Sequence, residues 1–325
     1  MKSMKGRQQV RVSNRKATFK FELNRNITIL CGDSGTGKTT LYNMIADYTR
    51  LKEASGVNLS SSCPCVALMD LDWKNQLDGV TESIVFIDEG LPDLRTTEFA
   101  TAIKNSSNYY VLITREPLYE LPYSVDEIYE LKTSGKMHTF RKRYPSSRKF
   151  HRYTPTSRMA ADFTTVLTED ARAGFQFFTK YFENTGVTCV AAAANSNIFK
   201  WLKDHPKEKT IVIADGAAFG AEMERVMKHC NTNEGARQLC LPESFEWLIL
   251  KSGIVKIPQL GDILENTSDY VECTEFISWE RFFADLLIQQ TKDTPFQYQK
   301  GTLNPVYAQT NNREKIASEI LDGKE

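Results

Sequence analysis

Short apolar runs alternate with amphipathic segments along most of the chain. The runs end in polar or turn-forming residues, as buried strands do, whereas the segments between them repeat apolar residues at the helical period, with Phe177, Phe199 and Trp201 predicted as core. A first array has predicted strands at 17–23, 26–32, 65–70, 83–89 and 108–115, with helices near 38–50 and 96–104. A second has predicted strands at 163–169, 187–194, 209–215 and 236–241, with helices at 170–186, 195–205, 221–230 and 243–253. The alternation predicts an α/β protein with two successive, mostly parallel sheets.

A change of composition separates the two arrays. Residues 136–158 carry eight Lys or Arg and no Asp or Glu, with two prolines and four aromatic residues. We therefore predict a first domain at 1–135, a basic linker at 136–160, a second domain at 161–290 and a C-terminal tail at 291–325. The basic stretch 136–158 would suit the phosphates and bases of a nucleic acid. A solvated connector is the alternative, and residues 130–140 resemble a β-hairpin that closes the first domain.

Overall composition limits the classes of protein. At 325 residues, the chain is long enough for two domains. Its 41 basic residues balance 41 acidic ones, so any binding to nucleic acid or to an anionic membrane must be local. Seven scattered cysteines, and no apolar stretch of roughly 18 residues, predict a cytoplasmic protein without a membrane partner. The sequence allows a homo-oligomer without specifying one.

The strongest motif is GDSGTGKTT at 32–40, which follows an apolar strand and precedes a helix. It fits G-x-x-x-x-G-K-[ST] in the context that phosphate binding requires. Backbone N–H groups of such a loop wrap phosphate oxygens, the lysine reaches the β- and γ-phosphates, and the threonine hydroxyl ligates Mg²⁺. ATP and Mg²⁺ are the expected cofactors. The predicted nucleotide-binding residues are Gly32, Asp33, Ser34, Gly35, Thr36, Gly37, Lys38, Thr39 and Thr40.

Two later strands end in candidate catalytic residues. The strand in SIVFIDEG ends in Asp88 and Glu89. Asp88 is placed to hold Mg²⁺ through water, and Glu89 to orient or deprotonate an attacking water, which predicts hydrolysis; two plain surface acids are the alternative. The next strand leads to Arg115, which is predicted either to sense the γ-phosphate or to pair with Glu116. The predicted catalytic residues are therefore Lys38, Glu89 and Arg115.

These motifs resemble those of P-loop NTPases with an ABC/AAA-like core, which have an additional strand between the phosphate loop and the second acidic motif. Residues 14–41 look like the opening of an ABC-type ATPase head. The resemblance covers roughly residues 8–135 and implies an ATPase. It departs from the ABC pattern because there is no LSGGQ-like signature, and because the motifs are too close for the usual helical insertion. Neither a composite ATP site across a dimer nor a transport role follows from it.

Acidic residues also end two strands of the second array. Glu169 follows the first strand and Asp215 the third, so both are expected at one edge of a parallel sheet. This layout resembles the TOPRIM fold of topoisomerases, primases and the overcoming-lysogenization-defect nucleases. There, a glutamate and a D-x-D-x-x-G motif hold divalent metal for phosphodiester chemistry. In this chain the motif reads DGAAFG at 215–220, so Ala217 replaces the second acid.

The alanine leaves two functions open. Glu169 and Asp215 alone would hold Mg²⁺ weakly, so another carboxylate would have to complete the site. Alternatively, the negative charges of these acids only stabilise the starts of the helices that follow them. ATP then either gates a metal-dependent nuclease of a phage-defence or mobile-element type, or switches a protein- or DNA-binding module. The candidates for the missing ligand are Asp170, Glu222 and Glu243, and the predicted metal ligands of both domains are Thr39, Asp88, Glu169 and Asp215.

Overall fold

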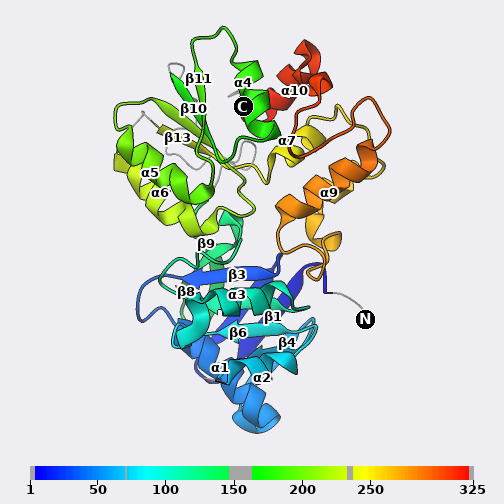
Figure 1. The fold of residues 1–325 in the computed structure, drawn as a ribbon. Helices are drawn as coiled ribbons and strands as arrows, with labels where there is room; N and C mark the ends of the chain where they lie inside the picture. Colours follow the sequence, from blue (N-terminus) through cyan, green and yellow to red (C-terminus); the bar gives the residue numbers. More distant parts are fainter. Residues whose placement is uncertain (1–3, 70–71, 146–162, 233–236, 322–325) are drawn as a thin grey trace. The chain divides into compact units, whose positions relative to one another are not determined.

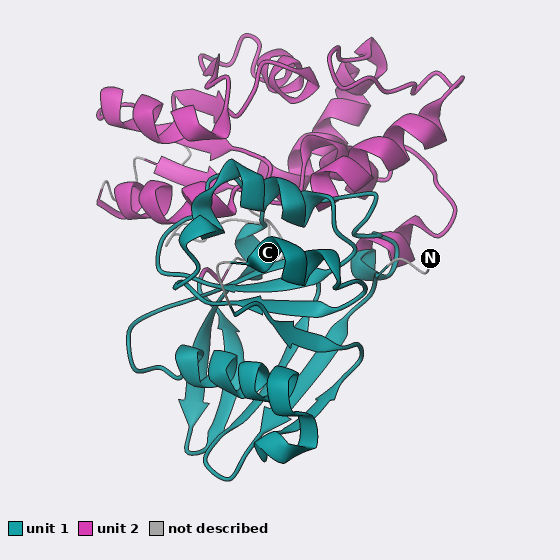
Figure 2. Ribbon diagram, turned by 60° about the horizontal axis from the view of Figure 1, so that its bottom comes forward, with its two compact units in different colours: residues 1–143, 265–277 teal, residues 144–264, 278–325 magenta. Residues whose placement is uncertain are grey.

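The structure, a computed structural model, describes residues 4–69, 72–145, 163–232 and 237–321. They form a mixed α/β protein with two compact units (Figure 2). Unit 1 comprises Met1–Arg143 and Glu265–Ile277, and unit 2 comprises Tyr144–Leu264 and Ser278–Glu325. Two sheets are found among the described residues, one in each unit, which confirms the predicted α/β class at this coarse level.

Unit 1 is built on a nine-stranded sheet in the order β4-β1-β2-β9-β8-β3-β7-β6-β5. Figure 1 shows this sheet with several of its strands labelled. Its strands are β1 (Gln8–Ser13), β2 (Thr18–Leu23), β3 (Ile27–Cys31), β4 (Asn58–Ser61), β5 (Cys65–Ala67), β6 (Ile84–Ile87), β7 (Tyr109–Ile113), β8 (Ile128–Ser134) and β9 (Met137–Lys142). From β5 to β8 the neighbouring strands are parallel, and β3, β6 and β7 are buried throughout, as central parallel strands are. β1 pairs antiparallel with β2 and β4, so the sheet is only partly parallel. The antiparallel pair of β8 and β9 confirms the predicted hairpin.

One strand separates the two strands that end in the motifs. β7 pairs in parallel with β3 and with β6, so that Leu112 lies opposite both Ile29 and Ile87. Parallel strands share their carboxyl edge, so the glycine loop after β3 and the acids after β6 lie at the same edge. The helix α1 (Lys38–Leu51) begins there and buries Leu41 and Ile45 in the core. The unit also contains α2 (Trp73–Asp78), α3 (Thr97–Lys104) and the 3₁₀ turns η1 (Lys52–Ser55), η2 (Pro92–Arg95) and η3 (Val125–Glu127).

A short segment from the C-terminal half belongs to unit 1. Residues 265–277 contain the 3₁₀ turn η4 (Thr267–Asp269). The Gly6 N–H donates to the Ser268 carbonyl at 2.7 Å, and the Cys273 N–H donates to the Met4 carbonyl at 3.2 Å. Cys273 is buried in the same hydrophobic cluster as Met4. Residues 265–277 therefore interrupt the second domain predicted at 161–290. The sequence did not show this, because the contacts join residues far apart in the chain.

Unit 2 contains a four-stranded, wholly parallel sheet in the order β11-β10-β12-β13. Its strands are β10 (Thr165–Thr168), β11 (Thr188–Ala191), β12 (Thr210–Ile213) and β13 (Arg237–Cys240). Its helices are α4 (Ala173–Tyr181), α5 (Asn195–Asp204), α6 (Gly220–Thr232), α7 (Phe245–Lys251), α8 (Leu260–Glu265), α9 (Trp279–Thr291) and α10 (Thr310–Leu321), with the 3₁₀ turn η5 (Pro305–Ala308). In Figure 1, α5 and α6 lie side by side. The chain crosses from β10 to β11 and returns to β12, which creates a topological switch point between β10 and β12.

Two predicted boundaries differ from the structure. The tail predicted at 291–325 is part of unit 2, since α10 packs on α7 and α4, and Tyr298 and Tyr307 are buried. The linker predicted at 136–160 begins inside the β8–β9 hairpin, whose strand β9 also pairs with β2. The remainder of that stretch, from 146 onward, lies outside the described residues.

Candidate functional site

Glycines shape the loop between β3 and α1. Gly32, Gly35 and Gly37 have φ angles of 109°, 80° and 103°, which residues with a side chain rarely adopt. Gly37 is the N-cap of α1, no described side chain bonds to this cap, and the first helical turn has no acidic residue. The first N–H groups of α1 are therefore left for another acceptor, and the helix dipole favours an anion there.

Lys38 directs its ammonium back into this loop. Its Nζ donates to the carbonyls of Gly32 and Asp33, both at 2.6 Å. Burial lowers the pKa of Lys38 and the charge of Arg115 lowers it further, whereas the charge of Glu89 raises it. A cation is therefore held inside the loop by backbone oxygens that phosphate oxygens can replace.

The acids after β6 are electrostatically linked to this lysine. Glu89 Oε1 forms an ion pair with Arg115 Nη2 at 3.2 Å. Burial raises the pKa of Asp88 and the charge of Glu89 raises it further, whereas the charges of Lys38 and Arg115 lower it. The structure thus brings together Lys38, Asp88, Glu89 and Arg115.

Neighbouring residues of the same motifs surround this group. Glu116, the alternative partner of Arg115, instead pairs with Arg95 at 2.7 Å. Thr114 is buried and donates to the Glu116 carbonyl at 2.9 Å, so its side chain shapes the turn after β7. Five of the predicted nucleotide-binding residues are exposed: Asp33, Ser34, Gly35, Thr39 and Thr40.

Two residues outside the motifs also border the site. Tyr42, one helical turn after Lys38, lines a pocket with Asp88. His138 of β9 lies beside Gly37, since a β-carbon at Gly37 would stand 3.5 Å from His138 Cε1. Helical spacing could have indicated Tyr42. His138 reaches the loop because β9 pairs with β8, which in turn pairs with β3, the strand before the loop.

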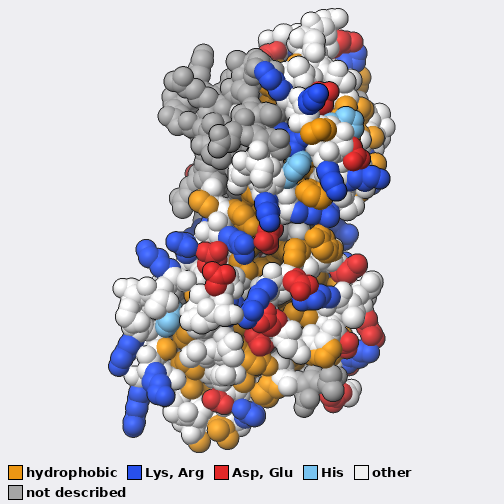
Figure 3. Space-filling view, turned by 90° about the vertical axis from the view of Figure 1, so that its left-hand side faces the viewer, with side chains coloured by type: hydrophobic (Ala, Val, Ile, Leu, Met, Phe, Trp, Pro, Cys, Tyr) orange, Lys and Arg blue, Asp and Glu red, His pale blue; other side chains and the backbone are white. Residues whose placement is uncertain are grey.

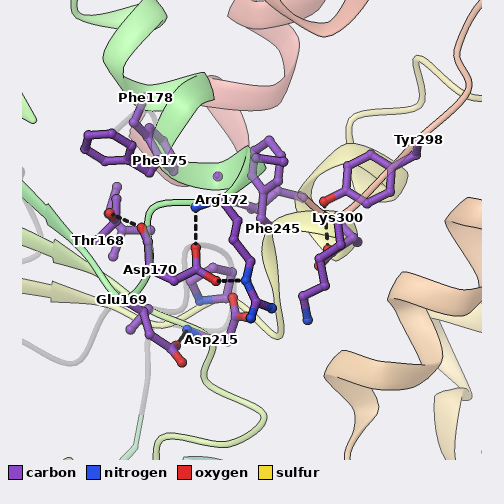
Figure 4. Close-up of a pocket in the computed structure, with 17 residues that line it drawn as sticks. Thr168, Glu169, Asp170, Arg172, Phe175, Phe178, Asp215, Phe245, Tyr298 and Lys300 are labelled. Carbon is purple, nitrogen blue, oxygen red and sulfur yellow. Dashed lines mark hydrogen bonds and ion pairs between the residues drawn. The ribbon is translucent and has the colours of Figure 1, made fainter. Parts of the chain in front are cut away.

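A second site lies at the switch point of the unit 2 sheet (Figure 4). Glu169 follows β10 and Asp215 follows β12, and these strands are paired with Thr168 opposite Ile213. The backbone N–H of Asp215 donates to Glu169 Oε2 at 3.2 Å, so the two residues are neighbours, as the sequence predicted. The pocket that they line also contains Phe175, Phe178, Phe245, Glu246, Tyr298 and Lys300.

Burial raises the pKa of both carboxyls. The pKa of Glu169 rises to about 7, because of burial and then the charge of Glu280. The pKa of Asp215 is raised well above its ordinary value by burial, by Glu280 and by Glu169. Lys300, ion-paired with Glu280, opposes both shifts. Such a pair of acids favours a bound proton or cation between them.

Three pocket residues come from outside the predicted motifs. Tyr298 is 2% exposed and donates its hydroxyl to Glu246 Oε1 at 2.7 Å. Glu246 lies on α7, whereas Tyr298 and Lys300 come from the predicted tail. No local sequence signal joins these residues to Glu169, because only the folding of the C-terminal segment onto the sheet brings them together.

The position of the missing acid does not line this pocket. Ala217 is 2% exposed, and its N–H donates to the Glu243 carbonyl at 3.3 Å. The adjacent Gly216 is so close to the end of β13 that a β-carbon there would lie 2.6 Å from the Leu241 carbonyl oxygen. A carboxylate at position 217 would therefore be buried outside the pocket.

The candidate replacements do not complete a metal site. Asp170 lines the pocket but pairs with Arg172, with 3.5 Å between Oδ2 and Nε, whereas Glu222 pairs with Arg225 and Glu243 is buried elsewhere. Among residues 4–69, 72–145, 163–232 and 237–321, no three Asp, Glu, His or Cys side chains are arranged to hold a metal ion.

The alternative role of Asp170 and Asp215, at the starts of helices, also differs from the structure. The N-cap of α4 is Arg172 rather than Asp170, although Asp170 Oδ1 accepts the Arg172 N–H at 2.9 Å. Residues 216–219 separate Asp215 from α6. The placement of Asp215 is therefore explained by the strand end and the pocket rather than by a helix cap.

The distribution of charge on the surface does not indicate a particular partner. On the face drawn in Figure 3, Lys and Arg side chains are interspersed with Asp and Glu. Most of the basic stretch, 146–158, lies outside the described residues, so contact with nucleic acid stays a prediction. Among the helices that the structure describes, none has the length and apolarity needed to cross a bilayer.

The aromatic residues predicted as core are only partly so. Phe177 is fully buried, but Phe199 and Trp201 of α5 are partly exposed. Phe199 lies 5.3 Å from the Arg225 guanidinium, and Trp201 stacks on His205 at 4.2 Å. Their spacing placed them on one helix without showing which face that helix buries.

Comparisons with known proteins do not assign the chain to a family. No family model matches the sequence, and a search of curated proteins gives no match either. The fold and its two sites therefore define a mixed α/β protein with a glycine loop at one sheet edge and an acidic pocket at the other sheet.

Proposed function

We propose that unit 1 binds ATP with Mg²⁺ and hydrolyses it to ADP and phosphate. The observation that carries the proposal is the position of Lys38, inside a glycine loop that joins a buried strand to an uncapped helix start. The acids after β6 support it, because they lie at the same sheet edge with β7 between their strand and β3. The proposed class is a P-loop NTPase with an additional strand.

The residues present fit a magnesium nucleotide. The first N–H groups of α1 would bind phosphate oxygens, and the Lys38 ammonium would exchange loop carbonyls for β- and γ-phosphate oxygens. Thr39 and Asp88 would hold Mg²⁺, which when bound neutralises charge on those oxygens. Glu89 would take a proton from a water whose oxygen bonds to the γ-phosphorus, while the bond to the bridging oxygen breaks and ADP takes the electron pair.

Lys38→Ala tests this proposal. The change removes the main side-chain counter-charge of the phosphates, so calorimetry should show that the wild-type protein binds ATP and that the variant does not. Lys104→Ala, which changes an exposed lysine at the end of α3, is the control and should bind as the wild type does. Equal ATP affinity in all three proteins would remove the P-loop assignment.

For unit 2 there are two candidate functions under control of the nucleotide. The contact between Glu169 and Asp215 at a switch point favours metal-dependent cleavage of nucleic acid by a TOPRIM-like domain. The burial of Ala217 favours the alternative, a binding module for protein or DNA that ATP switches. The second candidate needs no further carboxylate ligand.

Asp215→Asn distinguishes these candidates. If Mn²⁺ binds between Glu169 and Asp215, it should raise the melting temperature of the wild-type protein by mass action and leave that of the variant unchanged. The wild-type protein should then also nick plasmid DNA with Mn²⁺ and ATP. Asp204→Asn, at an exposed position of α5, is the control. If Mn²⁺ does not change the melting temperature of the wild-type protein, the nuclease candidate is rejected and the binding module remains.

A further inference from the structure

The sheet order places two different surfaces on either side of the phosphate loop. β7 and β6 lie on one side of β3, and β8 and β9 lie on the other. Asp88 and Glu89 are on the β6 side, so the γ-phosphate of a bound nucleotide belongs there. A nucleoside at the opposite end of the triphosphate would then extend toward β8 and β9.

His138 is the aromatic side chain that borders the loop on that side. Its ring lies beside Gly37, where a β-carbon would stand 3.5 Å from Cε1 and 3.6 Å from Nδ1. The ring therefore lies within van der Waals distance of the start of α1. A base attached to phosphates in the loop can reach this ring.

Contacts with Phe19 and Thr133 hold the ring of His138 in place. It stacks on Phe19 with 4.4 Å between ring centroids and 16° between planes, and Phe19 is fully buried. Nδ1 lies 2.9 Å from Thr133 Oγ1, within hydrogen-bond distance. His138 itself is partly exposed, so a ring with one face covered keeps its other face for a planar ligand.

We infer that His138 stacks on the base of the nucleotide bound in unit 1, an inference that rests on the proposed function. Every base has a π-face, so stacking adds affinity without reading hydrogen-bonding groups. His138 therefore favours nucleoside triphosphates over inorganic triphosphate, and it does not separate ATP from GTP.

Calorimetry on the full chain with Mg²⁺ and three probes, ATP, GTP and inorganic tripolyphosphate, tests this role. His138→Ala should weaken ATP and GTP alike, by about tenfold or more, and leave tripolyphosphate unchanged. His138→Phe keeps a stacking ring and should bind all three as the wild type does. His205→Ala is the matched control, because it removes another histidine ring stacked on an aromatic residue, in unit 2, and should change nothing.

Three results would overturn the inference. The first is a His138→Ala variant that binds ATP as the wild type does. The second is an equal loss of ATP and tripolyphosphate affinity, which would mean that the ring only supports the loop. The third is a His138→Phe variant as weak as the alanine. A wild-type protein that binds neither ATP nor tripolyphosphate would instead overturn the proposed function, and this inference with it.

Discussion

Glu89 and Arg115 neutralise each other at the edge of the unit 1 sheet. Both side chains are partly exposed, at 35% and 55%, so water screens their attraction and the pair contributes little to stability. Its importance is therefore one of position. Arg115 holds the Glu89 carboxylate near Lys38 and Asp88, and a γ-phosphate would compete with Glu89 for the guanidinium.

Glu89→Gln should leave ATP bound but slow its hydrolysis at least about a hundredfold, the low end of what a positioned base contributes. The amide keeps the size of the side chain and cannot take a proton from water. Phosphate release at saturating ATP measures the loss. Glu116→Gln is the matched control, because this neighbouring glutamate pairs with Arg95 instead of Arg115. This variant should hydrolyse ATP at the wild-type rate. Hydrolysis at the wild-type rate in Glu89→Gln would place the water-activating group elsewhere.

The loop from β12 to α6 is the element that positions Asp215. The Gly216 N–H donates to the Pro242 carbonyl at 2.6 Å, and the missing side chain lets this loop approach the end of β13. Both atoms that a β-carbon would strike first are backbone oxygens, of Leu241 at 2.6 Å and Pro242 at 2.9 Å. Backbone cannot rotate away as a flexible side chain can, so the loop itself must move.

Gly216→Ala should therefore destabilise the protein by about 1–3 kcal/mol, the usual cost of an overpacked site. Urea unfolding followed by circular dichroism measures the change. Gly301→Ala is the control, because nothing lies within 4 Å of its β-carbon position and it does not need a left-handed φ. If both variants unfolded at the wild-type midpoint, the close approach of the loop to β13 would be incorrect.

At the scale of the whole molecule, each unit contains a glutamate whose pKa is raised by burial. In unit 1, Glu127 is 2% exposed and its pKa rises to about 7, because burial outweighs the opposing charge of Arg25 at 3.8 Å. In unit 2, burial raises the pKa of Glu169 to about 7 as well. The ordinary value for glutamate is 4.5, so both groups bind a proton more tightly in the folded protein than in the unfolded chain.

The free energy of unfolding should consequently fall as pH rises from about 4.5 to about 7, and these groups should add no further change above that. The unfolded chain loses these protons first, so rising pH favours unfolding in this window. Glu127→Gln cannot ionise, so in urea unfolding its stability relative to the wild type should rise as pH increases from about 4.5 to about 7. Glu98→Gln changes an exposed carboxyl and should follow the wild type. A constant difference between Glu127→Gln and the wild type would contradict the raised pKa.

The sequence by itself determined the local elements. The strands β3, β6, β7, β10 and β12 lie where apolar runs predicted them, because a buried strand needs a continuous apolar segment and polar residues end it. The glycine loop was also predictable from the sequence, since positive φ angles at three positions favour glycine there. The contact of Glu169 with Asp215 also followed, because βα units of ordinary length place alternate strand ends at one edge.

Only the tertiary structure decided which distant residues join these elements. Residues 265–277 return to unit 1, Tyr298 and Lys300 enter the acidic pocket, and His138 reaches the glycine loop before α1. The burial of Ala217 likewise depends on the end of β13. Each of these contacts joins segments far apart in the chain, and its stability comes from burial and pairing across the fold rather than from local propensity, so no short stretch of sequence encodes it.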